Sequence, residues 1–138
     1  MTQDIRWQQR FENYQRALAL LREPFEGDVS KLSALERGGV IQRFEVALEL
    51  AWKTMKDYLE YDGHAVEPST VRVVIKEAAA TGLIANGAIW LEMVENRNRL
   101  SHTYDGSTFE EAVLSLRDHW LGAFDDLRVV LLKRREQA

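Results

Sequence analysis

The segment from Trp90 to Gly106, WLEMVENRNRLSHTYDG, gathers residue types that suit chemistry on an anion. An arginine cannot lose its proton and presents a planar fork of N–H donors to a phosphate. A histidine titrates near neutral pH and can accept a proton as a general base. The polar residues of the segment are Arg97, Asn98, Arg99, Ser101, His102 and Tyr104. A packed helical protein would place leucines here, so the cluster indicates a functional site.

The helix expected to carry this cluster sets limits on its geometry. Apolar residues recur there at steps of three and four, and Arg97 falls in the same phase, so it needs an acceptor or an opening to water. Asn98 and His102 share a face, whereas Arg97 and His102 are separated by about 140°. Arg97 and His102 converge only if the helix loosens near Ser101 or if two copies meet across a two-fold axis. The turn signal Asp105-Gly106 predicts the end of the helix.

Two alternatives stay open for these side chains. In the first, Arg97 and His102 are a buried pair that only satisfies itself at a helix end. The second concerns the helix expected to precede this one, where Glu45, Glu49 and Lys53 line one flank. We expect that flank to be solvated, with Glu49 and Lys53 in a favourable i,i+4 order. Otherwise Glu45 or Glu49 accepts a hydrogen bond from Arg97.

Composition predicts one folded domain over residues 1–138. Hydrophobic residues make up 46% of the chain, with two prolines and eight glycines, which favours a mostly helical protein. There is no cysteine, no apolar run long enough for a membrane, and no signal-peptide core, so we expect a cytoplasmic location. The net charge of −4 gives no general attraction to nucleic acid. The three histidines are far apart in sequence, and we expect no metal site and no cofactor. His119, beside a tryptophan, is expected to be a boundary residue.

Hydrophobic periodicity predicts about five helices and no strand, which makes an all-α, up-and-down bundle. The expected helices span residues 2–22, 31 or 33 to 61, 68–81, 87–105 and 107–130. Pro68 suits the first turn of the third helix, and Asn86 suits the cap of the fourth. A capping box of Ser107 with Glu110, or of Thr108 with Glu111, is expected for the fifth. Gly38-Gly39 is expected to mark a kink or a close helix approach.

Two stretches of the chain resemble a known family. LERGGVIQRFEVALELAWKTMKDYLEYDG is similar to the long second helix of the bacterial nucleotidyltransferase substrate-binding proteins, and IWLEMVENRNRLSHTYDG to their signature segment. These proteins belong to the HEPN superfamily, defined by an arginine followed four to six residues later by a histidine. Arg97, four further residues and His102, with Tyr104, match the Arg-x4-His-x-Tyr form of HepT-type toxins.

The resemblance implies a helical homodimer that partners a separately encoded, minimal nucleotidyltransferase of the MNT type. It implies that the chain is the toxin of a toxin-antitoxin pair, a metal-independent ribonuclease that the partner silences by adenylylating Tyr104. Arg97 and His102 would be catalytic, and Asn98 would be the polar residue after the motif arginine. The alternative is a non-catalytic subunit that binds nucleotide or substrate for a two-subunit nucleotidyltransferase. The residues fit the ribonuclease, since His102 supplies a base and Arg97 a cation for RNA cleavage.

Overall fold

The computed structural model describes residues 2–103 and 105–138, with side chains from residue 5 onward. Every regular element in these ranges is helical, which confirms the predicted all-α class. The helices are α1 (Thr2–Arg22), α2 (Ala34–Tyr61), α3 (Val71–Ala80), α4 (Gly87–Leu100), α5 (Gly106–Ser115) and α6 (Leu121–Gln137). Two short 3-10 turns, Glu23–Glu26 and Val29–Lys31, join α1 to α2. A π-helical turn, Leu116–Trp120, joins α5 to α6 without a break, so these three segments form the predicted fifth helix.

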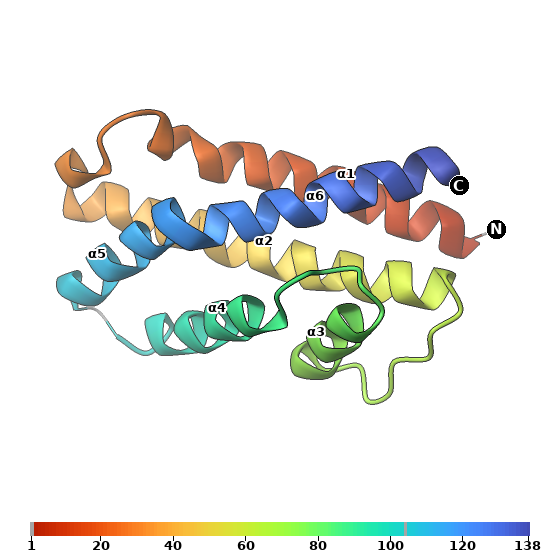
Figure 1. Ribbon diagram of the computed structural model, residues 1–138. Coiled ribbons are helices and arrows are strands. Elements are labelled where there is room, and N and C mark those ends of the chain that lie inside the picture. Colours follow the sequence, from red (N-terminus) through yellow and green to blue (C-terminus); the bar gives the residue numbers. More distant parts are fainter. Residues whose placement is uncertain (1, 104) are drawn as a thin grey trace.

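The helices run up and down along one long axis (Figure 1). α1 and α2 form an antiparallel hairpin, the short α3 lies at an angle to the long axis, and α4 runs back along α2 as the third leg. The continuous α5–α6 rod is the fourth leg, and α6 lies beside α1, so the chain ends near the start of α1 (Figure 1). None of the helices in the described ranges is both long and apolar enough to cross a lipid bilayer.

Aromatic side chains fill the centre of the bundle and tie its legs together. Phe44 of α2 stacks on Trp120 at 5.1 Å between ring centroids, and Trp90 of α4 meets Phe124 of α6 edge to face at 5.3 Å. The buried Tyr14 hydroxyl donates to the Phe124 carbonyl oxygen at 2.6 Å. These contacts hold the first turn of α4 against α6, which is itself packed on α2 through Phe44 and Phe124.

The third helix begins later than predicted. α3 starts at Val71, and Pro68 lies in the preceding loop instead of in the first helical turn. The cap is the Thr70 side chain, which accepts a hydrogen bond from the Val73 backbone N–H at 3.4 Å. A hydroxyl that satisfies a free backbone donor fixes the start of a helix more strongly than a proline that tolerates one.

Two further predictions about helix geometry are corrected. The cap of α5 is Asp105, whose carboxylate accepts from the Ser107 backbone N–H at 3.1 Å, so neither predicted capping box forms. α2 runs unbroken through Gly38 and Gly39. A Cβ atom added at either glycine would meet nothing within 4 Å, so neither marks a close helix approach within the bundle. The predicted Asn86 cap of α4 is confirmed.

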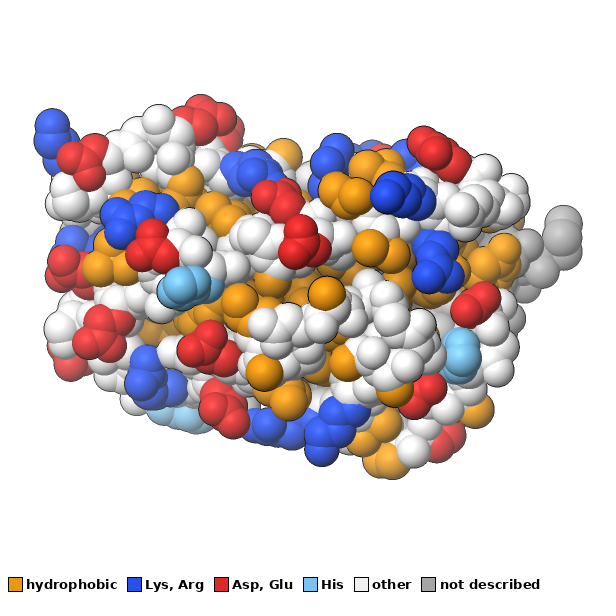
Figure 2. All heavy atoms as spheres, viewed as in Figure 1, with side chains coloured by type: hydrophobic (Ala, Val, Ile, Leu, Met, Phe, Trp, Pro, Cys, Tyr) orange, Lys and Arg blue, Asp and Glu red, His pale blue; other side chains and the backbone are white. Residues whose placement is uncertain are grey.

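The face on which α6 lies is hollowed between α6 and the α3–α4 pair, where hydrophobic side chains are visible (Figure 2). This groove has a volume of about 540 Å³, and its walls include Ile84, Ile89, Val129 and Val130. His119 lies at its edge and is exposed, as a boundary residue should be. Among the described residues predicted for the site, Arg97, Asn98 and His102 do not line this groove.

Candidate functional site

The polar cluster lies where α4 ends, and this end comes earlier than the turn signal predicts. α4 stops at Leu100, before Asp105-Gly106. The Arg97 carbonyl oxygen accepts from both the Ser101 N–H, at 3.1 Å, and the Ser101 hydroxyl, at 2.9 Å. The His102 N–H donates to the Arg99 carbonyl at 3.1 Å, which makes a tight turn. A side-chain hydroxyl that competes for a helical carbonyl favours such an end. The helix therefore does loosen near Ser101.

Arg97 occupies a half-buried position against α2. Its side chain is 22% exposed, and its Nη1 atom donates to the Glu49 Oε2 atom at 3.3 Å. Its Nη2 atom donates to the Asn98 Oδ1 atom at 3.3 Å. Arg97 thus has the hydrogen-bond acceptor that a charged side chain at an otherwise apolar position needs. The sequence allows either a solvated flank of α2 or a hydrogen bond from Arg97 to Glu45 or Glu49. The hydrogen bond to Glu49 is confirmed, and the prediction that Glu49 is fully solvated is wrong.

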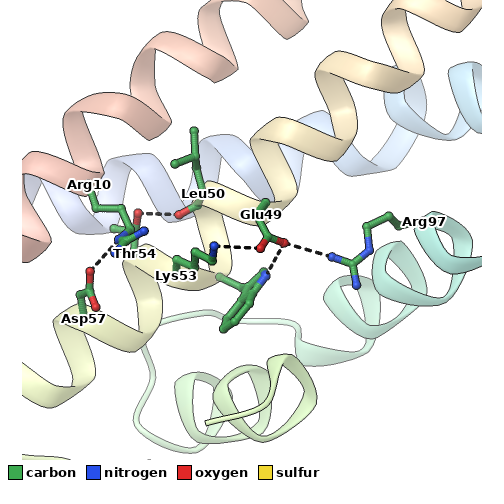
Figure 3. Close-up of polar contacts among 8 residues, drawn as sticks. Arg10, Glu49, Leu50, Lys53, Thr54, Asp57 and Arg97 are labelled. Atoms are coloured by element: carbon green, nitrogen blue, oxygen red, sulfur yellow. Dashed lines mark hydrogen bonds and ion pairs between the residues drawn. The ribbon is translucent and has the colours of Figure 1, made fainter. Parts of the chain in front are cut away.

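Glu49 binds three donors at once (Figure 3). Its Oε2 atom also accepts from the Trp52 indole N–H at 3.0 Å, and its Oε1 atom lies 3.0 Å from the Lys53 ammonium. Burial alone would raise the pKa of Glu49, but the hydrogen bonds from Trp52 and Lys53 and the charges of Lys53 and Arg97 outweigh it. The pKa of this carboxyl therefore lies below its ordinary value, and Glu49 is a carboxylate at neutral pH.

His102 is exposed in the turn after α4, and so is Asn98 on the last turn of the helix. No hydrogen bond between His102 and Arg97 occurs in the described part of the chain, where Arg97 binds Glu49 and Asn98 instead. A buried Arg–His pair that satisfies itself is therefore wrong. The structure places a fixed guanidinium and an exposed imidazole at the same end of one helix.

Tyr104, the predicted modification site, lies outside the described residues. Its chain neighbours Thr103 and Asp105 belong to the connection between α4 and α5. Within residues 2–103 and 105–138, no group of three His, Cys, Asp or Glu side chains is placed to hold a metal ion.

A shallow groove runs beside the Arg97 guanidinium along α2. Its lining residues are Gln42, Glu45, Val46, Glu49, Leu50 and Arg97. Val46 is 48% exposed, although it is one of the large hydrophobic residues of the chain. The groove thus combines an arginine that points out of α4 with an apolar strip of α2 that faces solvent.

Trp52 was not among the residues predicted for the site. Its indole N–H fixes the carboxylate that in turn binds Arg97. The available signal was spacing, since Glu49, Trp52 and Lys53 stand at i, i+3 and i+4 and share one face of α2.

Comparison with known proteins identifies the family of this chain. The family described as "Nucleotidyltransferase substrate binding protein like" matches residues 9–133, which is nearly the whole bundle. The chain belongs to this family. Membership in the nucleotidyltransferase substrate-binding proteins confirms the resemblance carried by the α2 and α4 segments.

One curated protein is similar to part of this chain. It is the probable ribonuclease HepT of Haemophilus influenzae, which is 36% identical over 72 residues. The aligned region covers 49% of this chain and 48% of that protein, so the likeness spans about half the length of each.

Proposed function

We propose that this chain is the helical partner subunit of a minimal nucleotidyltransferase and acts as a metal-independent endoribonuclease toxin in the cytoplasm. The proposal rests on one observation: the Arg97 guanidinium, held by Glu49, and the exposed His102 lie at the same end of α4. The partial likeness to a probable ribonuclease supports this activity, and the family of the chain supports a nucleotidyltransferase partner.

The proposed reaction is a transesterification within an RNA strand. The ribose 2′-oxygen attacks the adjacent phosphorus as His102 removes its proton. The bond from phosphorus to the 5′-oxygen breaks, that oxygen takes a proton from water, and a 2′,3′-cyclic phosphate forms. Negative charge builds on the phosphoryl oxygens along the way, and the Arg97 fork stabilises it. Asn98 holds one end of the guanidinium and keeps its plane fixed.

We further propose that two copies form an isologous dimer with α4 near the two-fold axis. The exposed Val46 and the partly exposed Leu50 beside Arg97 would be covered by the second copy. Such a dimer places two Arg97–His102 sets in one cleft, because a two-fold interface brings the same surface patch together from both subunits.

The nucleotidyltransferase partner is proposed to silence the site at Tyr104. The phenol oxygen of Tyr104 attacks the α-phosphorus of ATP, an oxygen–phosphorus bond forms, and pyrophosphate leaves with the electrons of the broken bond. The phenol proton passes to a base or to water. An adenylyl group two residues beyond His102 adds a phosphate charge and a bulky base next to the cleft. Both would obstruct the approach of an RNA phosphate.

A second function, in which the subunit binds a nucleotide or substrate without cutting RNA, is favoured by the words "substrate binding" in the family's description. The two functions are separated by incubating the purified chain with single-stranded RNA in excess chelator. The endoribonuclease yields fragments that end in a 2′,3′-cyclic phosphate. Intact RNA together with measurable ATP binding would support the binding subunit instead.

A further inference from the structure

We infer that Glu49 is a positioning residue for Arg97, an inference that rests on the proposed function. Glu49 lies on α2, a helix that carries none of the motif residues. It holds the guanidinium by one N–H and leaves other N–H donors of Arg97 for a phosphate.

The carboxylate is fixed by groups other than Arg97. Trp52 and Lys53, both within one turn of Glu49 on α2, donate to its two oxygens at 3.0 Å each. Glu49 therefore keeps its rotamer whether or not Arg97 is present. A carboxylate that is held in this way can orient the Arg97 side chain. Arg97 is the more mobile of the two because its long stem has many rotamers.

Glu49 could position the Arg97 guanidinium for a phosphate or block it, and the number of N–H donors that stay free distinguishes the two. A guanidinium has five N–H donors, and Glu49 and Asn98 each accept from a different terminal nitrogen. In the described part of the chain no acceptor contacts the Nε atom, and Glu49 and Asn98 take one N–H each, so three of the five donors remain for phosphate oxygens. The single 3.3 Å contact to Glu49 orients the fork without occupying it.

The contact also places α4 relative to α2. Arg97 is on the last turn of α4, directly before the Ser101 turn that carries His102. An anchor at this turn sets the position of both groups with respect to the groove along α2. Loss of the anchor should therefore lower the turnover number more than it weakens substrate binding, because misplacement of about 1 Å costs about 10²-fold in rate.

The test compares Glu49→Ala, Glu49→Gln and Glu92→Ala with the wild type. Glu92 is a matched control, since its carboxylate also accepts from a tryptophan indole, that of Trp120 at 3.1 Å, and is not a partner of Arg97. Two readouts are taken on each protein. One is kcat and KM for RNA cleavage, and the other is the nitrogen-15 spectrum of the Arg97 side chain, which reports how fast the guanidinium rotates.

Positioning predicts that Glu49→Ala lowers kcat by about 10- to 100-fold with a smaller change in KM. Glu49→Gln keeps an acceptor oxygen and should lose less than tenfold, and Glu92→Ala should cut like the wild type. The Arg97 nitrogen signals should be resolved in the wild type and in Glu92→Ala, and averaged in Glu49→Ala. Equal guanidinium rotation in Glu49→Ala and the wild type would overturn the inference. Faster cutting by both Glu49 variants would also overturn it, because Glu49 would then be a competitor for Arg97. If the wild type cuts no RNA, the proposed function fails, and the spectra alone decide the role of Glu49.

Discussion

The Arg97 guanidinium and the Glu49 carboxylate, 48 positions apart in the chain, meet at 3.3 Å between Nη1 and Oε2. The pair joins the last turn of α4 to the middle of α2 (Figure 3). It gives a half-buried cation its acceptor and leaves that cation facing a groove. An arginine placed only for stability would have no need of an open side, whereas one that binds a phosphate requires it.

Replacement of Arg97 by lysine should abolish most RNA cleavage without unfolding the chain. An ammonium keeps the charge but loses the planar fork, so we expect a rate loss of about 10²–10³-fold. The ion pair with Glu49 is partly exposed, so the free energy of unfolding should change by less than about 1 kcal/mol. Arg99→Lys is the matched control, because Arg99 is exposed and donates to Asn96. Equal cleavage by the two variants would argue against the fork.

Acid should remove the contribution of Glu49 to stability. Its pKa is lowered in the folded chain, so the stabilisation is present above the ordinary glutamate pKa of about 4.3 and is lost as pH falls through the lower folded value. Urea denaturation of the wild type and Glu49→Gln should therefore give the larger difference in unfolding free energy at neutral pH. The difference should shrink in acid. A difference that grows on acidification would contradict the direction of the shift.

Two exposed valines distinguish the proposed dimer face from the rest of the surface. Val46 lines the groove beside Arg97 and is 48% exposed, and Val129 lines the groove along α6 and is 46% exposed. Light scattering should show a dimer for the wild type and for Val129→Glu, and a monomer for Val46→Glu. A charge placed in an apolar interface without a partner is costly, which is the reason for the difference. A wild-type monomer at micromolar concentration would reject the dimer.

Modification of Tyr104 is checked by intact mass. The chain is incubated with the nucleotidyltransferase and ATP, and each adenylyl group adds the mass of one AMP less one water. Wild type should gain this mass and lose RNA cleavage, while Tyr104→Phe should gain none and stay active. Tyr61→Phe, a change at a partly exposed tyrosine of α2, should behave like the wild type. Mass added to Tyr104→Phe would place the modification elsewhere.

The helices of this protein follow from periodic sequence, because buried residues recur at helical spacing along each one. Trp7, Phe11, Tyr14, Leu18 and Leu21 of α1 are all buried, as their spacing predicts. The ends of the helices were less predictable, since they depend on which side chain satisfies the free backbone groups. At α4 this was the Ser101 hydroxyl, and at α5 the Asp105 carboxylate.

For the candidate site, sequence alone proposes the residues but does not determine which side chains they contact. Because Arg97 falls among the apolar positions of its helix, it is expected to need a hydrogen-bond acceptor. Glu45 and Glu49 of α2 are the two candidates. Which of the two accepts depends on the rotation of α2 against α4, and this is set by tertiary packing. The structure selects Glu49, one turn beyond Glu45.

In the proposed function, His102 acts as the base in RNA cleavage without a metal ion. The most direct measurement compares cleavage rates of the wild type, His102→Ala and His119→Ala on one RNA in excess chelator. His119 is the matched control, an exposed histidine in the π-helical turn between α5 and α6. We predict that the wild type and His119→Ala cut equally, with 2′,3′-cyclic phosphate ends, and that His102→Ala is slower by about 10²–10⁴-fold. All three should unfold at similar temperatures, since both histidines are exposed. Cleavage by His102→Ala at the wild-type rate, or no cleavage by the wild type, would contradict the claim.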